Sequence, residues 1–398
     1  MFNEIPEIID ALKNGEIVII TDDMNRENEG DLVMIAEKTT PKSINFMAKY
    51  GRGLICTPVN KAFAKRLNLP KMTEEKTDQY KTAFTVSVDA SEGISTGISA
   101  HDRAKTILLL AKEKTEEKQL TSPGHVFPLV AREGGVLVRA GHTEATVDLA
   151  RMADATPVGV ICEIMNDDGS MARIPELKKF REKHNLKWTS IEKLIAYRRK
   201  TETYISKGKT AELPTKFGEF VLTCYTSTID KKDYLALVYG DISDGKSLLV
   251  RMHSECLTGD VFKSSRCDCG EQLEKAMEMI VEEGRGIIVY LRQEGRGIGL
   301  ANKVHAYHLQ DKGLDTVEAN IELGFKADLR EYGIGAQILK DLGVKSIRLL
   351  TNNPKKVVGI DGYGIHIEKR EPLICKPQKY NKRYLDTKKE KLGHILPD

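Results

Sequence analysis

Three cysteines in the second half of the chain make the clearest metal-binding pattern in the sequence. They follow the spacing Cys256-x10-Cys267-x-Cys269. Cys267 and Cys269 are two positions apart, so in an extended segment their side chains lie on the same side. Three thiolates favour Zn²⁺, and a zinc ion with three protein ligands keeps one position for water. With His253 as a fourth ligand the site would be closed and structural, and the spacing alone leaves both alternatives open.

A glycine-rich turn and a group of basic residues accompany these cysteines. The segment EGRGIGLANK follows a predicted strand and opens a predicted helix, so its backbone amides are placed to bind phosphate. Its glycines alternate and do not match the dinucleotide-binding pattern. The basic residues of the surrounding motifs are Arg251, Arg296, Arg330, Lys355 and Lys356. This is more positive charge than a monophosphate requires, and it favours a triphosphate.

Two charged segments of the first half suggest a second site. RENEGD, which begins at Arg26, is a dense charged turn between two apolar strands, and alone it would indicate a solvated loop. RAGHTE, from Arg139, ends a predicted strand and begins a helix, where Arg139 and Thr143 favour anion binding. His142 with Glu27 could hold a hard divalent cation. A phosphate pocket beside such a metal indicates a phosphorylated sugar, with the metal stabilising an enediolate and carboxylates moving protons.

Two further residues of the first half carry groups suited to proton transfer. Glu163 lies on the apolar strand VGVICEI, where burial raises the pKa of a carboxyl group. His125 precedes a Phe-Pro turn, and its surroundings leave a structural and a functional role equally open.

The elements that must position these residues mix helices and strands without a regular βαβ period, which favours an α+β fold. A helix is expected over 4–13, and strands over 16–21 and 31–36. The segment from Gly134 predicts a strand, a tight turn and then a helix with Thr143 as its N-cap. In the second half, the segment 271–284 predicts a helix that ends at Gly284, followed by a buried strand over 286–291.

Length and composition place these elements in two domains of a cytoplasmic protein. At 398 residues the chain is too long for one ordinary core, and we expect domains over 1–200 and 201–398, each with a mixed sheet and packed helices. No run approaches the about 18 apolar residues that span a bilayer, so no membrane association is expected. Seven scattered cysteines indicate a reducing compartment.

Near the expected boundary, residues 178–209 hold eleven Lys or Arg against three acids. We interpret this stretch as a solvated basic connector between the domains rather than a polyanion-binding surface. The net charge of +3 does not indicate nucleic-acid binding.

The first half resembles the family of 3,4-dihydroxy-2-butanone 4-phosphate synthases. The segments that carry the resemblance are, in order, RENEGD, TGISAHDRAKTI, GHVFPL, RAGHTEA and VGVICEI. The resemblance implies conversion of D-ribulose 5-phosphate to formate and L-3,4-dihydroxy-2-butanone 4-phosphate, with Mg²⁺ or Mn²⁺ held by Glu27 and His142. It implies His125 and Glu163 as catalytic residues. The implied substrate-binding residues are Arg26, Glu27, Asp31, Arg139, Ala140, Gly141, His142, Thr143 and Glu163.

The second half resembles GTP cyclohydrolase II. The segments are RMHSECLTGDVFKSSRCDCGEQL, RQEGRGIGLANK, DTVEAN, GFKADLREYGIGAQIL and LLTNNPKK, over roughly residues 205–375. The resemblance implies that one Zn²⁺ per chain, bound by Cys256, Cys267 and Cys269, activates water for attack on C8 of GTP. The implied products are formate, pyrophosphate and a 2,5-diaminopyrimidinone ribosyl phosphate. The implied GTP-binding residues are Arg251, Met252, His253, Ser254, Glu255, Gln272, Glu294, Gly295, Arg296, Thr316, Thr351 and Lys356.

The same resemblance implies Asp328 as the general base and Arg330 as the nucleophile. A guanidinium with a pKa above about 12 is a poor nucleophile, so Arg330 could equally clamp the α-phosphate. We therefore expect a bifunctional enzyme of riboflavin biosynthesis, acting as a homodimer on ribulose 5-phosphate and GTP. The alternatives are that one half is an inactive scaffold, or that the chain is a zinc-containing regulator.

Overall fold

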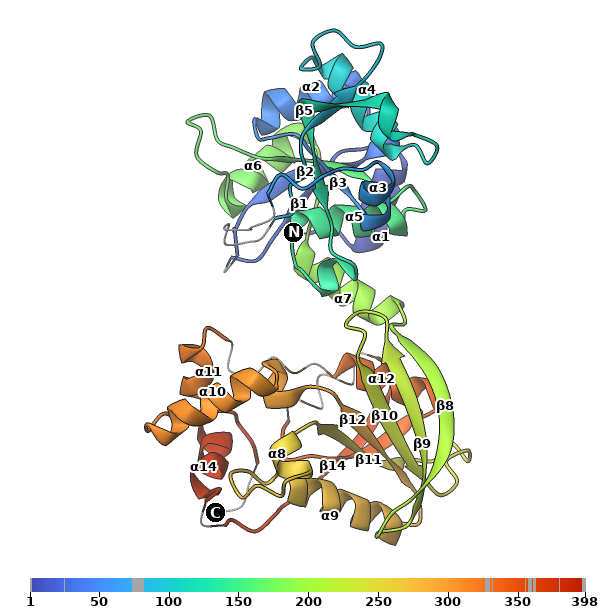
Figure 1. The fold of residues 1–398 in the computed structure, drawn as a ribbon, viewed down its shortest axis with the longest axis vertical. Coiled ribbons are helices and arrows are strands. Elements are labelled where there is room, and N and C mark those ends of the chain that lie inside the picture. The colour runs from blue at the N-terminus through green and yellow to red at the C-terminus, as the bar shows by residue number, and fades with distance from the viewer. Residues whose placement is uncertain are drawn as a thin grey trace. The chain divides into compact units, whose positions relative to one another are not determined.

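The computed structural model describes residues 2–24, 26–73, 82–325, 330, 332–354, 356, 360, 363–378 and 380–395. The chain divides into two compact units, Met1–Thr201 and Glu202–Asp398. Each unit has a mixed sheet with packed helices (Figure 1), which confirms the predicted α+β class. None of the helices in the described ranges is both long and apolar enough to cross a membrane. The cytoplasmic location and the homodimer stay predictions.

Unit 1 is built on a seven-stranded sheet with the order β4-β5-β3-β6-β2-β1-β7. The strands are β1 (Val18–Thr21), β2 (Gly30–Ile35), β3 (Cys56–Val59), β4 (Val88–Ala90), β5 (Leu120–Val130), β6 (Gly159–Glu163) and β7 (Lys187–Ser190). β1 pairs with β7, and β3 with β5, in parallel, whereas the other neighbours are antiparallel. The sheet is therefore mixed.

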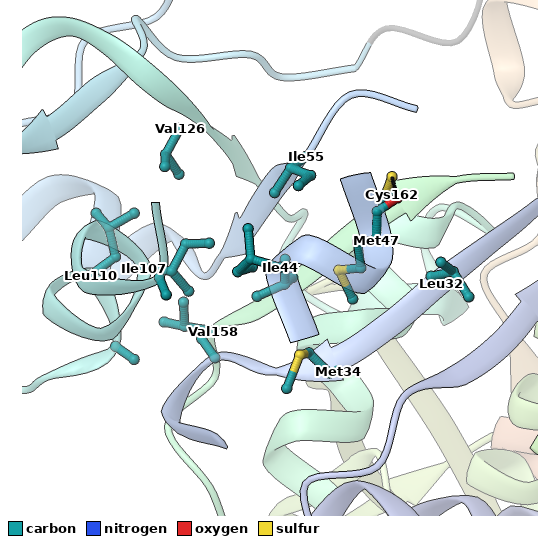
Figure 2. Packing of buried hydrophobic residues seen from close by; sticks show 14 of the residues in the cluster. Leu32, Met34, Ile44, Met47, Ile55, Ile107, Leu110, Val126, Val158 and Cys162 are labelled. Carbon is teal, nitrogen blue, oxygen red and sulfur yellow. Dashed lines mark hydrogen bonds between the residues drawn. The ribbon is translucent and has the colours of Figure 1, made fainter. Parts of the chain in front are cut away.

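Helices cover both faces of this sheet. They are α1 (Ile5–Lys13), α2 (Pro41–Phe46), α3 (Lys61–Arg66), α4 (Ala100–Ala111), α5 (His142–Met152), α6 (Ile174–His184) and α7 (Ile191–Thr201). Along β2, Leu32 and Met34 join a core with α2, α3, α4 and α6, part of which Figure 2 shows. Val33 and Ile35 join the opposite core, which α1, α5 and α7 cover. This two-sided burial explains why β1 and β2 are apolar at nearly every position.

The basic stretch near the expected boundary is not a connector. Residues 174–201 form α6, β7 and α7 within unit 1, and β7 pairs in parallel with β1. Leu177, Trp188 and Leu194 are buried beneath the charged side chains. The prediction weighted the charges and overlooked the apolar positions between them, which supply the buried face of each element.

A second correction concerns the start of α5. The predicted strand before it is a short 3-10 turn (Gly135–Leu137), and the N-cap is Gly141 rather than Thr143. Thr143 lies in the first turn of the helix and is buried.

Unit 2 has a seven-stranded sheet with the order β14-β13-β11-β12-β10-β9-β8. The strands are β8 (Ile205–Pro214), β9 (Glu219–Ser227), β10 (Asp233–Tyr239), β11 (Leu248–Ser254), β12 (Gly286–Leu291), β13 (Ser346–Leu350) and β14 (His366–Glu371). β14, β13, β11 and β12 run parallel to one another, and β10, β9 and β8 continue the sheet in antiparallel pairs.

The helices of unit 2 are α8 (Leu257–Asp260), α9 (Cys269–Glu282), α10 (Leu300–Asp311), α11 (Thr316–Glu322), α12 (Gly333–Asp341) and α14 (Lys382–Glu390). α9 and α12 pack on opposite faces of the sheet, in separate hydrophobic cores. A small third core joins α10 to α11. The predicted helix and strand at 271–291 are confirmed as α9 and β12, and Gly284 follows the helix with a positive φ of 82°.

Candidate active sites

One edge of the sheet in unit 1 gathers acidic residues from neighbouring strands. Asp31, near the start of β2, lies directly opposite Glu163, the last residue of β6. Directly opposite side chains on antiparallel strands are about 5 Å apart. Because strand residues alternate between faces, both carboxylates point to the face that α5 covers, together with Val33 and Ile161.

His125 reaches the same edge from β5. Its neighbour Phe127 pairs with Cys56 of β3, and Cys56 pairs with Ile161 of β6. His125 precedes Phe127 by two positions and Glu163 follows Ile161 by two, so both lie at the same end of the sheet. One strand separates them, which corresponds to about 10 Å.

A group of possible metal ligands lies beside these residues. Asp22, Glu27 and His142 each offer a ligand atom within 4.8 Å of the others. His142 begins α5 and is buried, and its Nδ1 lies 3.7 Å from Oε2 of Glu27. Nε2 of His142 and Oδ1 of Asp31 are buried, and neither has a hydrogen-bond partner among the described residues. A hard divalent cation with its water shell fits this donor set.

The loop after β1 is held in place by Asp22, which the sequence analysis did not single out. Its carboxylate accepts hydrogen bonds from the backbone amides of Glu27 at 3.0 Å and Glu29 at 2.9 Å. Arg26 lies between the two ligands, 2.8 Å from Asp22 and 2.9 Å from Glu27. Arg173 also anchors the loop, because it donates to the carbonyl oxygen of Glu27 at 2.6 Å.

Burial and neighbouring charge shift the acid–base behaviour of this group. Burial acts against protonation of His142, but the charges of Asp31 and Glu27 prevail and raise its pKa to about 9. Burial raises the pKa of Asp31 to about 7. Burial also opposes ionisation of Glu27, yet His142 and Arg26 hold its pKa below the ordinary value. The cluster can therefore hold and move protons near neutral pH.

Both proposed proton-transfer residues are held by specific contacts. Nδ1 of His125 lies 2.7 Å from Oδ2 of Asp89, and the amide of His125 donates to Oδ1 of the same carboxylate at 3.0 Å. A Cβ on Gly97 would lie 2.1 Å from Asp89 and 2.5 Å from His125, so the pair requires glycine there. Glu163 accepts from the amide of Leu54 at 2.8 Å.

The RAGHT segment meets this site through the start of α5. Ala140 is exposed, whereas Gly141, His142 and Thr143 are buried. The guanidinium of Arg139 contacts Glu144 at 2.6 Å and donates to Thr82 at 2.9 Å.

In unit 2 the second site lies where three parallel strands end. β11, β12 and β13 are neighbours, and the carboxyl ends of parallel strands meet at one edge of a sheet. Ser254 ends β11, Glu294 follows β12, and Thr351 follows β13. This topology explains how three motifs far apart in the chain converge.

The three cysteines converge as a metal site would require. Their sulfur atoms lie within 4.8 Å of one another, with Sγ of Cys256 and of Cys267 3.6 Å apart. Hydrogen bonds from Cys267 and Cys269, together with the charge of Lys303, hold the pKa of Cys256 well below its usual value. A Cβ on Gly259 would come within 3.0 Å of Cys267. Three close thiols, one ionised, fit Zn²⁺.

His253 contacts Asp260 rather than the three cysteines. Its Nε2 lies 3.1 Å from both carboxylate oxygens of Asp260, which also accepts from Tyr290 at 2.8 Å. Among the described residues, no fourth acidic or histidine ligand joins the three cysteines. The cluster therefore has an open side.

Two adjoining pockets extend from the cysteines. The first encloses about 660 Å³ and the second about 490 Å³, and both are lined by Ser254, Cys269, Arg296, Arg330 and Tyr384. Predicted residues that line the first are Glu255, Cys256, Cys267, Glu294, Gly295 and Thr316. Predicted residues that line the second are Arg251, His253, Gln272, Thr351 and Lys356.

The walls of these pockets carry buried polar atoms that have no hydrogen-bond partner within the described part of the chain. They are Nε of Arg251, Nδ1 of His253, Oγ of Ser254, Nη1 of Arg296 and Nδ2 of Asn320. Buried polar groups are rarely left unpaired, so the pockets are suited to a polar ligand. Met252 differs from its neighbours, because its side chain lies in the hydrophobic core and only its carbonyl oxygen meets Lys356, at 2.8 Å.

Comparisons with known proteins match each half of the chain to one enzyme family. The family models of 3,4-dihydroxy-2-butanone 4-phosphate synthase and of GTP cyclohydrolase II match residues 6–197 and 206–372. Proteins named riboflavin biosynthesis protein RibBA from Bacillus mycoides and Bacillus cereus are each 55% identical over 396 residues, covering 100% of both chains. The chain belongs to the family of bifunctional riboflavin biosynthesis enzymes.

Solved structures extend the comparison. A two-domain 3,4-dihydroxy-2-butanone 4-phosphate synthase from A. baumannii is 34% identical, covers 93% of this chain and 99% of its own, and has a TM-score of 0.70. A 3,4-dihydroxy-2-butanone 4-phosphate synthase in complex with two magnesium ions is 44% identical over 50% of this chain and 98% of its own, with a TM-score of 0.49. The two family models and the full-length relatives show that the chain joins a lyase, the synthase, to a hydrolase, the cyclohydrolase, and none of these comparisons supports an inactive half.

Several residues that lie in the two candidate sites were not predicted from the sequence. In the synthase these are Asp22 and Asp89; Asp22 begins the charged loop, but no local signal marks Asp89. In the cyclohydrolase, Lys303 donates to Sγ of Cys256 at 3.2 Å and to Glu294 at 2.7 Å, and Tyr307 lines the same pocket. Lys303 ends the EGRGIGLANK segment, and its position on a predicted helix could have indicated it.

Two predicted cyclohydrolase residues cannot be placed. Asp328, the predicted general base, and Lys355 lie outside the described residues. Arg330 is described and lines both pockets.

Proposed function

We propose that the acidic edge of unit 1 is the synthase active site and that it acts on D-ribulose 5-phosphate. Glu27 and His142, joined by Asp22, would hold Mg²⁺ or Mn²⁺, which supplies charge stabilisation to an enediolate. The observation that carries this proposal is the convergence of these three donors beside unpaired buried atoms of His142 and Asp31.

The other residues of the edge then bind the sugar phosphate and move its protons. Arg26 and Asp31 lie next to the metal donors, and Arg139 to Thr143 line the start of α5, where helix amides favour phosphate. Because Asp89 contacts Nδ1 of His125, the other ring nitrogen, Nε2, is the one that exchanges a proton with the substrate. Glu163, at the strand end opposite Asp31, is the second proton-transfer group.

The two pockets of unit 2 divide GTP between them. The second pocket presents Arg251, Arg296, Arg330 and Lys356, and the described part of its wall has no acidic residue, so it suits the triphosphate. The first holds the cysteines and Glu294 and suits the guanine. Zn²⁺ at the cysteines would supply Lewis-acid activation of water. Asp328 remains our proposed general base.

Arg330 is better suited to clamping a phosphate than to nucleophilic attack. It lines the second pocket with Arg251, Arg296 and Lys356, and a guanidinium is suited to bind phosphate oxygens through two parallel hydrogen bonds. We expect Arg330→Lys to weaken GTP binding but to retain slow pyrophosphate release. Quenched-flow mass spectrometry of the wild type tests the alternative, since a covalent guanylyl adduct would identify Arg330 as the nucleophile.

Formate release from each substrate tests both site assignments in one chain. We expect His142→Ala to abolish formate from ribulose 5-phosphate and to spare GTP turnover. Cys267→Ser should lose zinc and GTP turnover and spare the first reaction, whereas Cys224→Ser on β9 should change neither. In each variant the unaffected reaction shows that the other unit is intact, and thermal unfolding of the variant, compared with the wild type, serves as the control for folding of the mutated unit. Full ribulose 5-phosphate activity in His142→Ala at low Mg²⁺ would refute the metal site.

A further inference from the structure

The last residues of the chain lie beyond the segment that the cyclohydrolase family model matches, which ends at residue 372. Residues 380–395, here called the C-terminal segment, include α14, which packs beside α11 (Figure 1). Leu385 and Leu392 are buried, and the amide of Ile395 donates to the carbonyl of Asn352 at 2.8 Å. The segment is therefore anchored to the loop that follows β13.

Three side chains of this segment reach the pockets that we assign to GTP. Tyr384, Lys388 and His394 line the second pocket, and Tyr384 also lines the first. Tyr384 and Lys388 are four residues apart on α14 and so share one face of the helix. Tyr384 thus lies at the junction of the two pockets.

Lys388 connects the C-terminal segment to Asp268, a buried residue next to the proposed site. Its ammonium lies 2.7 and 3.0 Å from the two oxygens of Asp268, and both side chains are buried. Asp268 also accepts from Gln272 at 2.7 Å, and Gln272 accepts from Arg251 at 2.6 Å. A continuous polar chain therefore joins Lys388 to two proposed GTP-binding residues.

His394 has the clearest requirement for a ligand. Both of its ring nitrogens are buried and have no hydrogen-bond partner among the residues that the structure describes. Desolvation, followed by the charges of Lys388, Arg330, Lys356 and Arg296, lowers the pKa of His394 to about 3. A neutral imidazole N–H among these cations would be satisfied by an anionic oxygen.

We propose that the C-terminal segment completes the GTP site, with Lys388 and His394 binding the triphosphate and Tyr384 lying between triphosphate and guanine. This inference rests on the proposed GTP pockets and adds residues of the C-terminal segment to their binding surface. The ligand chemistry is a polyphosphate, because Lys388 adds positive charge, and His394 and Tyr384 add hydrogen-bond donors, to a wall that already holds four cations.

Binding measurements on the full-length zinc protein test the inference. The probes are a non-hydrolysable α,β-methylene analogue of GTP, and GMP. We expect Lys388→Met and His394→Asn each to weaken binding of the analogue about tenfold or more, with a much smaller effect on GMP. Zinc content and ribulose 5-phosphate turnover should not change. The matched controls are Lys382→Met, exposed on the same helix, and His366→Asn, exposed on β14, and both should bind as the wild type does.

The outcomes separate this inference from the assignment of the site. If Lys356→Ala weakens analogue binding while Lys388→Met and His394→Asn do not, the C-terminal segment is not part of the site. If Lys356→Ala also has no effect, the GTP pocket itself is misassigned. An equal loss of analogue and GMP binding would show a structural role and overturn the inference. Lys388→Met removes the ion-pair partner of Asp268, which lies between Cys267 and Cys269 in the sequence. If that variant loses zinc, the result for His394→Asn decides the test.

Discussion

His125 depends on Asp89 for its orientation, since the carboxylate contacts both its ring and its amide. Asp89→Asn keeps the size of the side chain but loses the charge that favours a proton on Nδ1. We predict that kcat with ribulose 5-phosphate falls about tenfold to a hundredfold, less than most of the about 10²–10⁴ that a general acid–base group contributes, because Asp89 acts through His125. KM, metal affinity and GTP turnover should change little. Asp167→Asn, at an exposed position, is the control; an unchanged kcat in Asp89→Asn would exclude the positioning role.

His142 makes metal binding depend on pH. Its pKa is raised to about 9, so the imidazole is protonated in the metal-free site below that pH and must lose a proton to bind a cation. Asp31, with a pKa of about 7, is ionised above pH 7. Between pH 9 and pH 7 we therefore predict that Mg²⁺ affinity falls by up to about tenfold per unit as the pH falls.

Calorimetry in buffers of different ionisation enthalpy measures this linkage. Binding at pH 8 should release close to one proton. Mg²⁺ binding without proton release would mean that His142 is not a ligand.

At the scale of elements, the basic stretch should behave as part of the core of unit 1. Trp188 on β7 is buried, packs edge-on against Phe2 at 4.9 Å, and donates to Thr21 at 3.3 Å. We predict that Trp188→Ala lowers the stability of unit 1 by about 3–5 kcal/mol. Lys179→Ala, exposed on α6, should change it by less than about 0.5 kcal/mol.

Thermal inactivation of the ribulose 5-phosphate reaction reports on this unit alone. The GTP reaction of the same protein is the internal control. If Trp188→Ala leaves the inactivation temperature unchanged, the stretch contributes nothing to the core.

At the scale of the whole molecule, each unit has its own sheet and its own hydrophobic cores. We predict that residues 1–201 and 202–398, expressed separately, retain synthase and cyclohydrolase activity respectively. Residues 1–190 should not fold stably, because they lack α7. Loss of Arg198 would leave Asp148, its buried partner at 2.6 Å, uncompensated at a cost of about 3–5 kcal/mol. Assays of the three fragments for formate release check this, and an active 1–190 fragment would contradict it.

Local motifs of the sequence were sufficient to predict the candidate reacting groups that lie close together in the chain. The spacing of Cys256, Cys267 and Cys269 indicated three sulfur ligands, and the apolar runs around Asp31 and Glu163 indicated strands. These signals are local, because metal-ligand spacing, strand composition and glycine-rich turns depend on residues near one another in the chain.

The contacts between segments that are far apart in the chain could be seen only in the folded structure. Asp89 meets His125 because β4 pairs with β5, and Asp22 meets His142 because α5 packs over the sheet edge. The basic stretch becomes α6, β7 and α7 because β7 pairs with β1, near the other end of unit 1. Lys388 and His394 line a pocket that we propose for GTP because α14 packs against α11. Strand pairing and helix packing join residues that no local pattern relates, so these contacts follow from the fold alone.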